Sequence, residues 1–296
     1  ALFAFPDSTS TTVARVSATT PPDTIPIEGN ARVEGKAGGL TISWDSFGPV
    51  TDAHFAAAEA PQRILLADDG QMRTMSWTLA HVADGLARQG QRFRFHTDER
   101  PGHPDQLVAA VLEPAGLTET ERFVQLRCKV AAPADATPEA AGDLPEIAIL
   151  DVITDNAPWL DLYREVLAPL PQRGVTTEAG IRRQVEDTAL ARPLFLGVAD
   201  PADPARLVAA ITATAVASSP GAPPVGELSL VAVRPEWRRR GLGAALVAAA
   251  LAHLADAGVR TALTYVDAGN ESALAFFSQA GFQERGARVY YEPQDR

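Results

Sequence analysis

Hydrophobic positions in the C-terminal half of the chain switch between a two-residue period and a helical period. Apolar residues alternate in 194–199 and 207–216, and Asp-Pro-Ala-Asp-Pro at 200–204 separates the two runs. Alternation predicts strands and the proline-rich break predicts a turn, so these runs indicate a hairpin. The elements then expected up to the C-terminus are strand, helix, strand, helix and strand at 226–233, 243–257, 261–266, 271–280 and 283–291.

This order specifies an α/β protein, with a mixed twisted sheet and flanking helices. The first half of the chain repeats it, with strands expected at 39–45, 63–68, 92–97 and 122–130 and helices at 72–89 and 104–114. Gly90 and Gly258 each follow a predicted helix, which is the usual place of a C-cap glycine. The repetition predicts two tandem copies of one fold. Between them we expect a strand or turn at 146–152 and helices at 159–167 and 178–188.

Composition divides the chain at two places. Residues 1–30 are rich in Thr, Pro and Ser and predict a flexible leader. Residues 132–145 are rich in Ala, Pro and Asp and predict a linker. We therefore expect one domain at 31–131 and a second at 146–296.

Charge and cysteine content exclude several classes of protein. The net charge of −11 and the pI near 4.9 argue against generic binding to nucleic acid or to anionic membranes. No apolar run approaches the roughly 20 residues that span a bilayer, and the N-terminus lacks the pattern of a signal peptide. The single cysteine, Cys128, excludes an internal disulfide and a cysteine-based metal cage. We expect a cytoplasmic protein that binds no metal.

An arginine-rich glycine turn at 238–243 breaks a rule of helix electrostatics. It reads Arg-Arg-Arg-Gly-Leu-Gly and leads from a predicted strand into a predicted helix. A helix N-terminus carries about +0.5 of an elementary charge, so cations are disfavoured there. A bound anion removes this conflict, and glycines let the backbone approach it closely. The turn predicts a diphosphate site, although it fits neither the Rossmann nor the Walker A pattern.

Two spaced motifs together resemble the GNAT superfamily of acyl-CoA N-acyltransferases. The first is Val-Arg-Pro at 233–235 with the turn at 238–243, directly after a strand. The second is Asn-Glu-Ser-Ala-Leu-Ala-Phe-Phe-Ser-Gln-Ala-Gly-Phe at 270–282. The resemblance covers 146–296 through these motifs and 40–130 only through the order of elements. Because the first half lacks the arginine–glycine turn, we interpret it as a degenerate copy without a coenzyme site.

The resemblance implies that acetyl-CoA is the co-substrate. In this family, backbone N–H groups of the turn hold the coenzyme A diphosphate, and the preceding strand pairs with the pantetheine arm. An N–H at the end of that strand polarises the thioester carbonyl. For Arg234, a phosphate contact and a solvated charge are both left open. The residues assigned to the coenzyme are Val231, Ala232, Val233, Arg238, Arg239, Arg240, Gly241, Leu242, Gly243, Ala244, Asn270 and Phe277.

Acylation of an amine needs a group that accepts its proton. Glu227 opens the strand at the position where several histone-type members of the family carry their catalytic glutamate, and a solvent-facing strand end is its other interpretation. Phe277 departs from the tyrosine that many members use as the acid for the departing thiol, because phenylalanine donates no proton. Tyr265 is our candidate substitute. Tyr290 and Tyr291 are alternatives, and packing is the other interpretation of all three.

The predicted reaction is transfer of an acetyl group from acetyl-CoA to a primary amine by direct attack in a ternary complex. The acceptor is a small molecule or a protein amine. Two alternatives remain: a non-catalytic acyl-CoA-binding or regulatory module, and a protein lysine or N-terminal acetyltransferase. Trp159 and Tyr163 belong either to an amine pocket or to the core.

Overall fold

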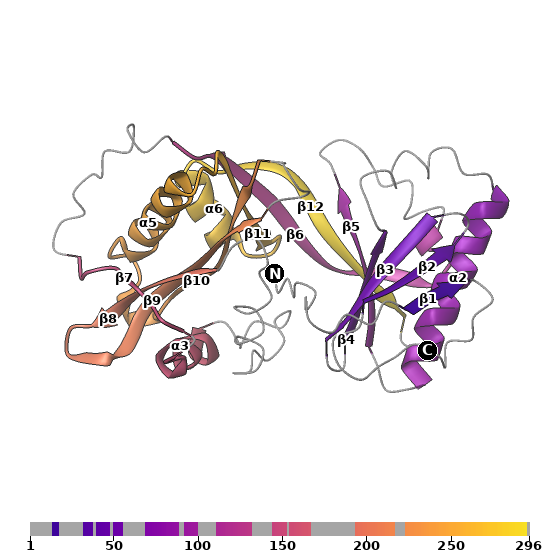
Figure 1. Ribbon diagram of the computed structural model, residues 1–296, viewed down its shortest axis with the longest axis horizontal. Coiled ribbons are helices and arrows are strands. Elements are labelled where there is room, and N and C mark those ends of the chain that lie inside the picture. Colours follow the sequence, from indigo (N-terminus) through magenta and orange to yellow (C-terminus); the bar gives the residue numbers. More distant parts are fainter. Residues whose placement is uncertain are drawn as a thin grey trace. The chain divides into compact units, whose positions relative to one another are not determined.

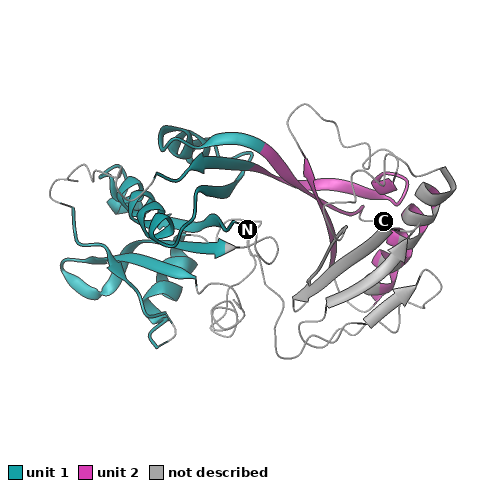
Figure 2. Cartoon of the chain, turned by 45° about the horizontal axis from the view of Figure 1, so that its top comes forward, with its two compact units in different colours: residues 1–5, 125–285 teal, residues 6–124, 286–296 magenta. Residues whose placement is uncertain are grey.

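The computed structural model divides the chain into two compact units, drawn in different colours in Figure 2. The C-terminal unit comprises 125–285 with 1–5, and the N-terminal unit comprises 6–124 with 286–296. Strands β6 (Leu117–Lys129) and β12 (Gln283–Pro293) contribute to both units, because the division falls within them. The structure describes residues 14–17, 32–37, 40–47, 50–55, 69–88, 92–99, 111–131, 144–152, 154–166, 193–216 and 223–294.

A mixed sheet forms the centre of the C-terminal unit. Its strand order is β12-β6-β11-β10-β9-β8-β7. The strands β8, β9 and β10 are antiparallel neighbours, and β11 joins β10 in parallel. Residues of β10 and β11 are alternately buried and half-buried, which is why their period was visible in the sequence. The bounds are β7 (Ala148–Ile149), β8 (Leu194–Asp200), β9 (Asp203–Val216), β10 (Val225–Val233) and β11 (Thr261–Asp267).

Helices cover both faces of this sheet (Figure 1). Helix α3 (Ala157–Val166) packs on β9 and β10, and its buried residues join Ala210 and Leu230 in one core cluster. Helix α5 (Leu242–Asp256) lies on the opposite face. There, a Cβ atom added to Gly226 of β10 would stand 2.6 Å from Leu254 Cδ1, so the absence of a side chain allows the close approach. Helix α6 (Glu271–Gln279) follows β11.

A β-bulge in β10 changes which of its side chains face α3. Ser229 pairs with Thr212 but Ala232 pairs with Ala210, so β10 advances three residues where β9 advances two. Leu230 lies in this bulge with a φ of 55°, a conformation uncommon for leucine. One extra residue reverses the alternation of faces. Odd-numbered positions before the bulge and even-numbered positions after it therefore share the face that α3 covers.

Strands β10 and β11 stop pairing after their first residues. Both strands are fully described, and their parallel pairs are Gly226 with Ala262 and Glu227 with Leu263. Beyond Glu227, the edge of β10 that faces β11 has backbone N–H and C=O groups that β11 does not pair. Backbone polar groups need other partners or water in such a place. This edge can accept an extended ligand as an added strand.

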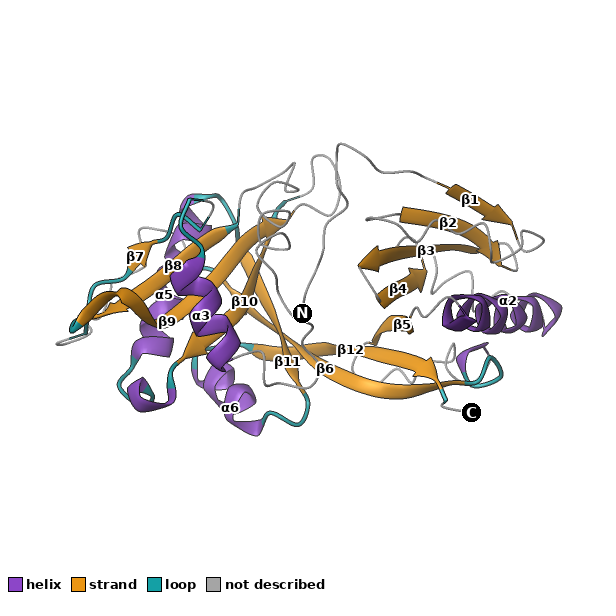
Figure 3. Cartoon of the chain, turned by 90° about the horizontal axis from the view of Figure 1, so that it is seen from below, coloured by secondary structure: helices purple, strands orange, loops and turns teal. Residues whose placement is uncertain are grey.

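The N-terminal unit has the strand order β1-β2-β3-β4-β5-β12-β6. Helix α2 (Asp69–Arg88) lies alongside these strands (Figure 3), and its buried Leu79 and Ala83 contribute to the core with Phe93 and Phe95 of β5. An ion pair between Arg288 Nε and Asp98 Oδ1, at 2.7 Å, links β12 to β5. The remaining bounds are β1 (Ala14–Ser17), β2 (Arg32–Ala37), β3 (Leu40–Phe47), β4 (Val50–Phe55) and β5 (Arg92–Glu99).

The α/β fold class and the predicted elements from 194 onward are confirmed. The main difference there is that β9 begins at Asp203, inside the predicted turn. The sequence pattern missed β2 and β4, and β1 lies within the predicted leader. The strand expected at 63–68, the helix at 178–188 and most of the helix at 104–114 fall outside the described residues. The domain boundaries at 131 and 146 stay predictions, and the units themselves divide at 125 and 286.

Candidate functional site

The turn that enters α5 has the backbone geometry of an anion site. Gly241 is the N-cap of the helix, with a φ of 85°, and Arg239 has a φ of 64°. Left-handed residues beside helical ones form concave groups of N–H donors. The cap has no side-chain hydrogen bond, and the first turn of α5 contains no acidic residue. The free N–H groups and the positive end of the helix dipole therefore favour a negatively charged ligand.

The three arginines of this turn are exposed, and two of them are fixed by local contacts. Arg238 Nε donates to the carbonyl oxygen of Val233 at 3.1 Å, and Arg240 Nη2 donates to that of Glu236 at 3.0 Å. The Arg240 guanidinium also lies 4.6 Å from the centre of the Trp237 ring, within the range of a cation–π contact. These contacts hold positive charge beside the start of α5 without neutralising it.

Glu236 lies on the short 3₁₀ helix η4 (Pro235–Trp237) and is paired with Arg206. Arg206 Nη2 donates to Glu236 Oε1 at 2.8 Å. This hydrogen bond is the main cause that lowers the pKa of Glu236 below its usual value. A carboxylate with a lowered pKa is a weaker base, so Glu236 is poorly suited to accept a proton from an amine.

Arg234 is neither a solvated charge nor a phosphate contact, which corrects both interpretations left open by the sequence. Its side chain is 1% exposed and forms ion pairs with Asp161 and Glu165 of α3. Its Nε also donates to the carbonyl oxygen of Leu207 at 2.7 Å. The physical reason is that α3 places two carboxylates over the end of β10, and a buried guanidinium requires such partners. Arg234, the residue between β10 and η4, thus joins the end of β10 to α3 and β9.

The strand residues assigned to the coenzyme lie at the C-terminal end of β10, where the bulge ends. Val231 and Val233 are half-buried, and Ala232 is buried in the core cluster under α3. Val233 comes within 3.9 Å of a Cβ added to Gly243, and the ring of Phe276 comes within 3.4 Å of it. The end of β10, the first turn of α5 and helix α6 therefore meet at Gly243. Sequence reasoning missed Phe276, since only its neighbour Phe277 belongs to the family motif.

Asn270 and Phe277 have structural roles of their own. Asn270 is the N-cap of α6, and its side chain accepts a hydrogen bond from the Ala273 N–H at 3.1 Å. Phe277 is 4% exposed and packs edge-on against Phe276 and Phe282. The second motif is therefore explained in large part by helix capping and core packing. The assignment of both residues to the coenzyme stays a prediction.

Glu227 and Tyr265 lie on the same face of neighbouring strands. Glu227 pairs with Leu263, and Tyr265 is two residues further along β11, an offset of about 7 Å along the strand. Both side chains are half-buried. Gln125 of β6 donates from Nε2 to the hydroxyl oxygen of Tyr265 at 2.7 Å. Gln125 lies in the strand predicted at 122–130, and no signal in the sequence indicated a role beyond that strand.

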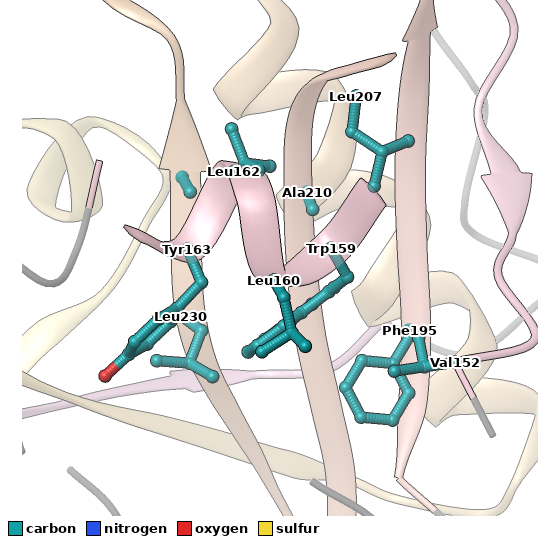
Figure 4. Packing of buried hydrophobic residues seen from close by; sticks show 10 residues of the cluster. Val152, Trp159, Leu160, Leu162, Tyr163, Phe195, Leu207, Ala210 and Leu230 are labelled. Atoms are coloured by element: carbon teal, nitrogen blue, oxygen red, sulfur yellow. The ribbon is translucent and has the colours of Figure 1, made fainter. Parts of the chain in front are cut away.

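Trp159 and Tyr163 belong to the core. Figure 4 shows the two residues on α3 against Leu230 of β10, with Phe195 of β8 close by. Trp159 is 3% exposed and Tyr163 is 1% exposed, and their rings stack with centres 5.3 Å apart. The core interpretation is therefore the one supported, because an amine pocket needs rings that a ligand can reach.

The two alternative tyrosines belong to a different unit from Glu227. Tyr290 and Tyr291 belong to the N-terminal unit, whereas Glu227 belongs to the C-terminal unit.

Burial raises the pKa of the Cys128 thiol to about 11. Within the described ranges, no group of three or more His, Cys, Asp or Glu residues could hold a metal ion. Among those same residues, no helix combines the length and the apolar character needed to cross a membrane.

Comparison with known proteins identifies relatives of this site and fold. The sequence profile of the acetyltransferase (GNAT) family matches residues 159–282. The mycothiol acetyltransferase of Salinispora arenicola is 33% identical over 194 residues, which cover 64% of this chain and 60% of that protein. That of Kocuria rhizophila is 30% identical over 214 residues, which cover 71% of this chain and 70% of the relative. The chain thus spans less than two thirds of the Salinispora protein.

Solved structures share the fold at low sequence identity. A GCN5-related N-acetyltransferase from Kribbella flavida has a TM-score of 0.60 at 18% identity and covers 90% of both chains. A tandem GNAT protein from the clavulanic acid biosynthesis pathway has a TM-score of 0.60 at 16% identity, with coverage of 88% of this chain and 82% of its own. These structures show the fold, and the profile match and the Kocuria relative show the family. The chain belongs to the GNAT acetyltransferase family.

Proposed function

We propose that this protein is an N-acetyltransferase that transfers the acetyl group of acetyl-CoA to a primary amine by direct attack. The observation that carries the proposal is the start of α5. A helix N-terminus without an acidic first turn follows three exposed arginines and a left-handed glycine cap. That combination stabilises a ligand with several negative charges. The adjacent unpaired edge of β10 supports a ligand that is also extended.

The residues present fit acetyl-CoA. In this proposal the backbone at 241–244 holds the diphosphate, and Arg238, Arg239 and Arg240 supply counter-charge. The edge of β10 from Val231 to Val233 pairs with the amide groups of the pantetheine arm, as strand addition would. Acetyl-CoA supplies an activated acyl group as a thioester. The left-handed cap at Gly241 leaves room for the ligand beside the backbone, and the absence of a side chain at Gly243 lets Phe276 pack closely against the start of α5.

The chain's own residues then handle the protons of the reaction. Glu227 accepts the proton that the amine nitrogen loses as its bond to the acetyl carbon forms. A backbone N–H at the unpaired edge of β10 stabilises the negative charge that develops on the carbonyl oxygen. Tyr265 donates its hydroxyl proton to the sulfur as the carbon–sulfur bond breaks. Glu227 and Tyr265 lie on one face of adjacent strands, which supports this division of work.

The acceptor is proposed from the names of the relatives. Both relatives described above are mycothiol acetyltransferases. We therefore propose the amine precursor of mycothiol as the first acceptor to test. The acidic net charge of −11 gives a basic protein substrate weaker support, because that charge is spread over the whole chain.

The diphosphate assignment is tested by replacing the glycine at each end of α5. Gly241 and Gly258 have φ values of 85° and 82°, and neither position has an atom close enough to clash with an added Cβ. Leucine at either position costs about 1–2 kcal/mol of stability through backbone strain. Only Gly241→Leu also blocks the approach of a ligand to the helix start. Calorimetric titration with acetyl-CoA should show a large loss of affinity for Gly241→Leu and little change for Gly258→Leu.

Equal affinities in the two variants would contradict a diphosphate at this helix start. Catalysis is measured separately, as release of free thiol from acetyl-CoA in the presence of the mycothiol precursor, a panel of small amines or lysine peptides. Turnover with the precursor supports the proposed acceptor, and turnover with peptides alone favours a protein acetyltransferase. Tight binding of acetyl-CoA without turnover on any acceptor would instead favour the non-catalytic module.

A further inference from the structure

Tyr265 is hydrogen-bonded to a strand that the family motifs do not include. Gln125 Nε2 lies 2.7 Å from the Tyr265 hydroxyl oxygen, and Gln125 Oε1 accepts a hydrogen bond from Arg127 Nε at 2.8 Å. Gln125 and Arg127 are two residues apart on β6, which lies next to β11 in the sheet. Arg127, Gln125 and Tyr265 therefore form a chain of hydrogen bonds across two strands.

The direction of this chain is set by the donor properties of its members. A guanidinium has only donors, so the oxygen of the Gln125 amide must face Arg127. The amide nitrogen then faces Tyr265 and donates to its oxygen, because an amide nitrogen does not accept. The Tyr265 oxygen acts as acceptor in this contact, and its own proton is directed away from Gln125.

We propose that Gln125 is a positioning residue for catalysis, which orients the Tyr265 hydroxyl so that its proton is presented for donation. This inference rests on the proposed function, in which Tyr265 protonates the leaving sulfur. It goes beyond that function by assigning a role to β6, a strand encoded before the two GNAT motifs. The half-buried setting of Gln125 and Tyr265 strengthens their hydrogen bond relative to one in water.

The proton transfer balances as follows. The carbon–sulfur bond breaks and its electron pair goes to sulfur, while the O–H bond of Tyr265 breaks and its proton forms the S–H bond. Negative charge then develops on the Tyr265 oxygen, and the N–H of Gln125 stabilises it. Glu227 holds the proton lost by the amine and releases it to solvent, from which Tyr265 is reprotonated. No oxidant or further reactant is required.

The test compares Gln125→Leu, Gln125→Glu and Tyr265→Phe in the full chain. Gln125→Leu removes the donor, and kcat should fall on the order of 10- to 100-fold, as expected for loss of a hydrogen bond to a developing charge. Gln125→Glu keeps the shape but turns the donor into an acceptor that draws the Tyr265 proton inward. It should lower kcat at least as much. The dissociation constant of acetyl-CoA, measured by calorimetry, should stay within about twofold.

A double-mutant cycle separates positioning from a structural role. In a Tyr265→Phe background, Gln125→Leu should cause no further loss of kcat, because the group that it orients is gone. The matched control is Gln283→Leu on β12. Gln283 accepts a hydrogen bond from Arg285 at 2.6 Å, which reproduces the Arg–Gln pair of β6 at an exposed site. This variant should keep the kcat of the unmodified protein.

The possible results distinguish the inference from the function on which it rests. If Tyr265→Phe lowers kcat and folded Gln125→Leu does not, the role of Gln125 is overturned and the acid role of Tyr265 survives. The same holds if the two losses multiply in the double variant. If Tyr265→Phe keeps full activity, the acid role and the inference both fail, although acetyl transfer itself stands.

Discussion

The arginine and glutamate side chains around the candidate site differ in their burial and in their partners. Arg238 and Arg240 are exposed cations held by the backbone, whereas Arg234 is a buried cation that two carboxylates neutralise. Glu236 is tied to Arg206, and Glu227 is half-buried on the same face as Tyr265. These differences follow from position rather than residue type. They identify Glu227 as the glutamate to test as a base.

Glu227→Gln should lower kcat by roughly 100- to 1,000-fold, the usual contribution of a general base. The glutamine keeps the shape of the side chain, so the affinity for acetyl-CoA should stay the same. Glu236→Gln is the matched control, since Glu236 is a glutamate of the same unit, on η4, that Arg206 already engages. Steady-state kinetics with the best acceptor measures both variants. Equal kcat values for the two would remove Glu227 from the mechanism.

Cys128 should make the stability of the protein depend on pH at the alkaline end. Burial raises the pKa of its thiol from 9.0 to about 11, so the folded chain keeps the proton over a range where the unfolded chain loses it. The unfolded state then binds fewer protons, and the free energy of unfolding falls as pH rises from about 9 to about 11. Urea titrations should show a smaller fall for Cys128→Ala. A Cys128→Ala variant with the same slope would contradict this prediction.

At the scale of elements, the bulge in β10 and its early separation from β11 shape the candidate site. The bulge rotates the end of β10 so that Ala232 faces α3 while Val233 faces the start of α5. The separation leaves a strand edge open next to the helix N-terminus. Neither feature is visible in the amino-acid composition of β10. The bulge depends on how β10 pairs with β9, and the open edge depends on where it stops pairing with β11.

Arg234 links the end of β10 to α3 and β9, and its replacement should destabilise the C-terminal unit. Arg234→Met should lower the free energy of unfolding by about 2 kcal/mol, below the 3–5 kcal/mol typical of a broken buried pair. The reason is that the side chains of Asp161 and Glu165 are 66% and 44% exposed and can return to water. Arg206→Met, at a more exposed pair, should lower the free energy of unfolding by less than Arg234→Met does. Chemical denaturation that ranks the variants in the opposite order would contradict this account.

At the scale of the whole molecule, the compact units do not coincide with the halves of the sequence. Residues 125–131 belong to the C-terminal unit, where the Val130 N–H donates to the carbonyl oxygen of Arg260 at 3.0 Å. Residues 286–296 belong to the N-terminal unit. A strand that starts in one unit and ends in the other gives no signal in composition, because its alternation continues without a break.

A fragment of residues 146–296 should therefore fold poorly, because it lacks the β6 residues of its own unit. Circular dichroism during a urea titration should show no cooperative transition for this fragment. A fragment of residues 117–296, which contains all of β6, should unfold more cooperatively. If the shorter fragment unfolded cooperatively and bound acetyl-CoA as tightly as the full chain, the sequence boundary at 146 would be the better description.

The sequence was sufficient wherever the signal is local. Alternation of burial predicted β10 and β11, and glycine with helical periodicity predicted α5 to within one residue at each end. The arginine–glycine turn was recognisable because a helix N-terminus and three adjacent cations conflict electrostatically. The sequence pattern failed to predict β2 and β4 in the first half. It also left two interpretations open for Arg234, since burial depends on α3, far away in the chain.

By itself, then, the sequence determined the α/β class, the family and the position of the predicted diphosphate site, because each depends on neighbours within a few residues. Only the tertiary structure decided that Arg234 and Trp159 are buried and that Gln125 reaches Tyr265. Those contacts join residues up to 140 positions apart in the chain. Such pairing is set by strand order and packing, to which a local pattern of residues is blind.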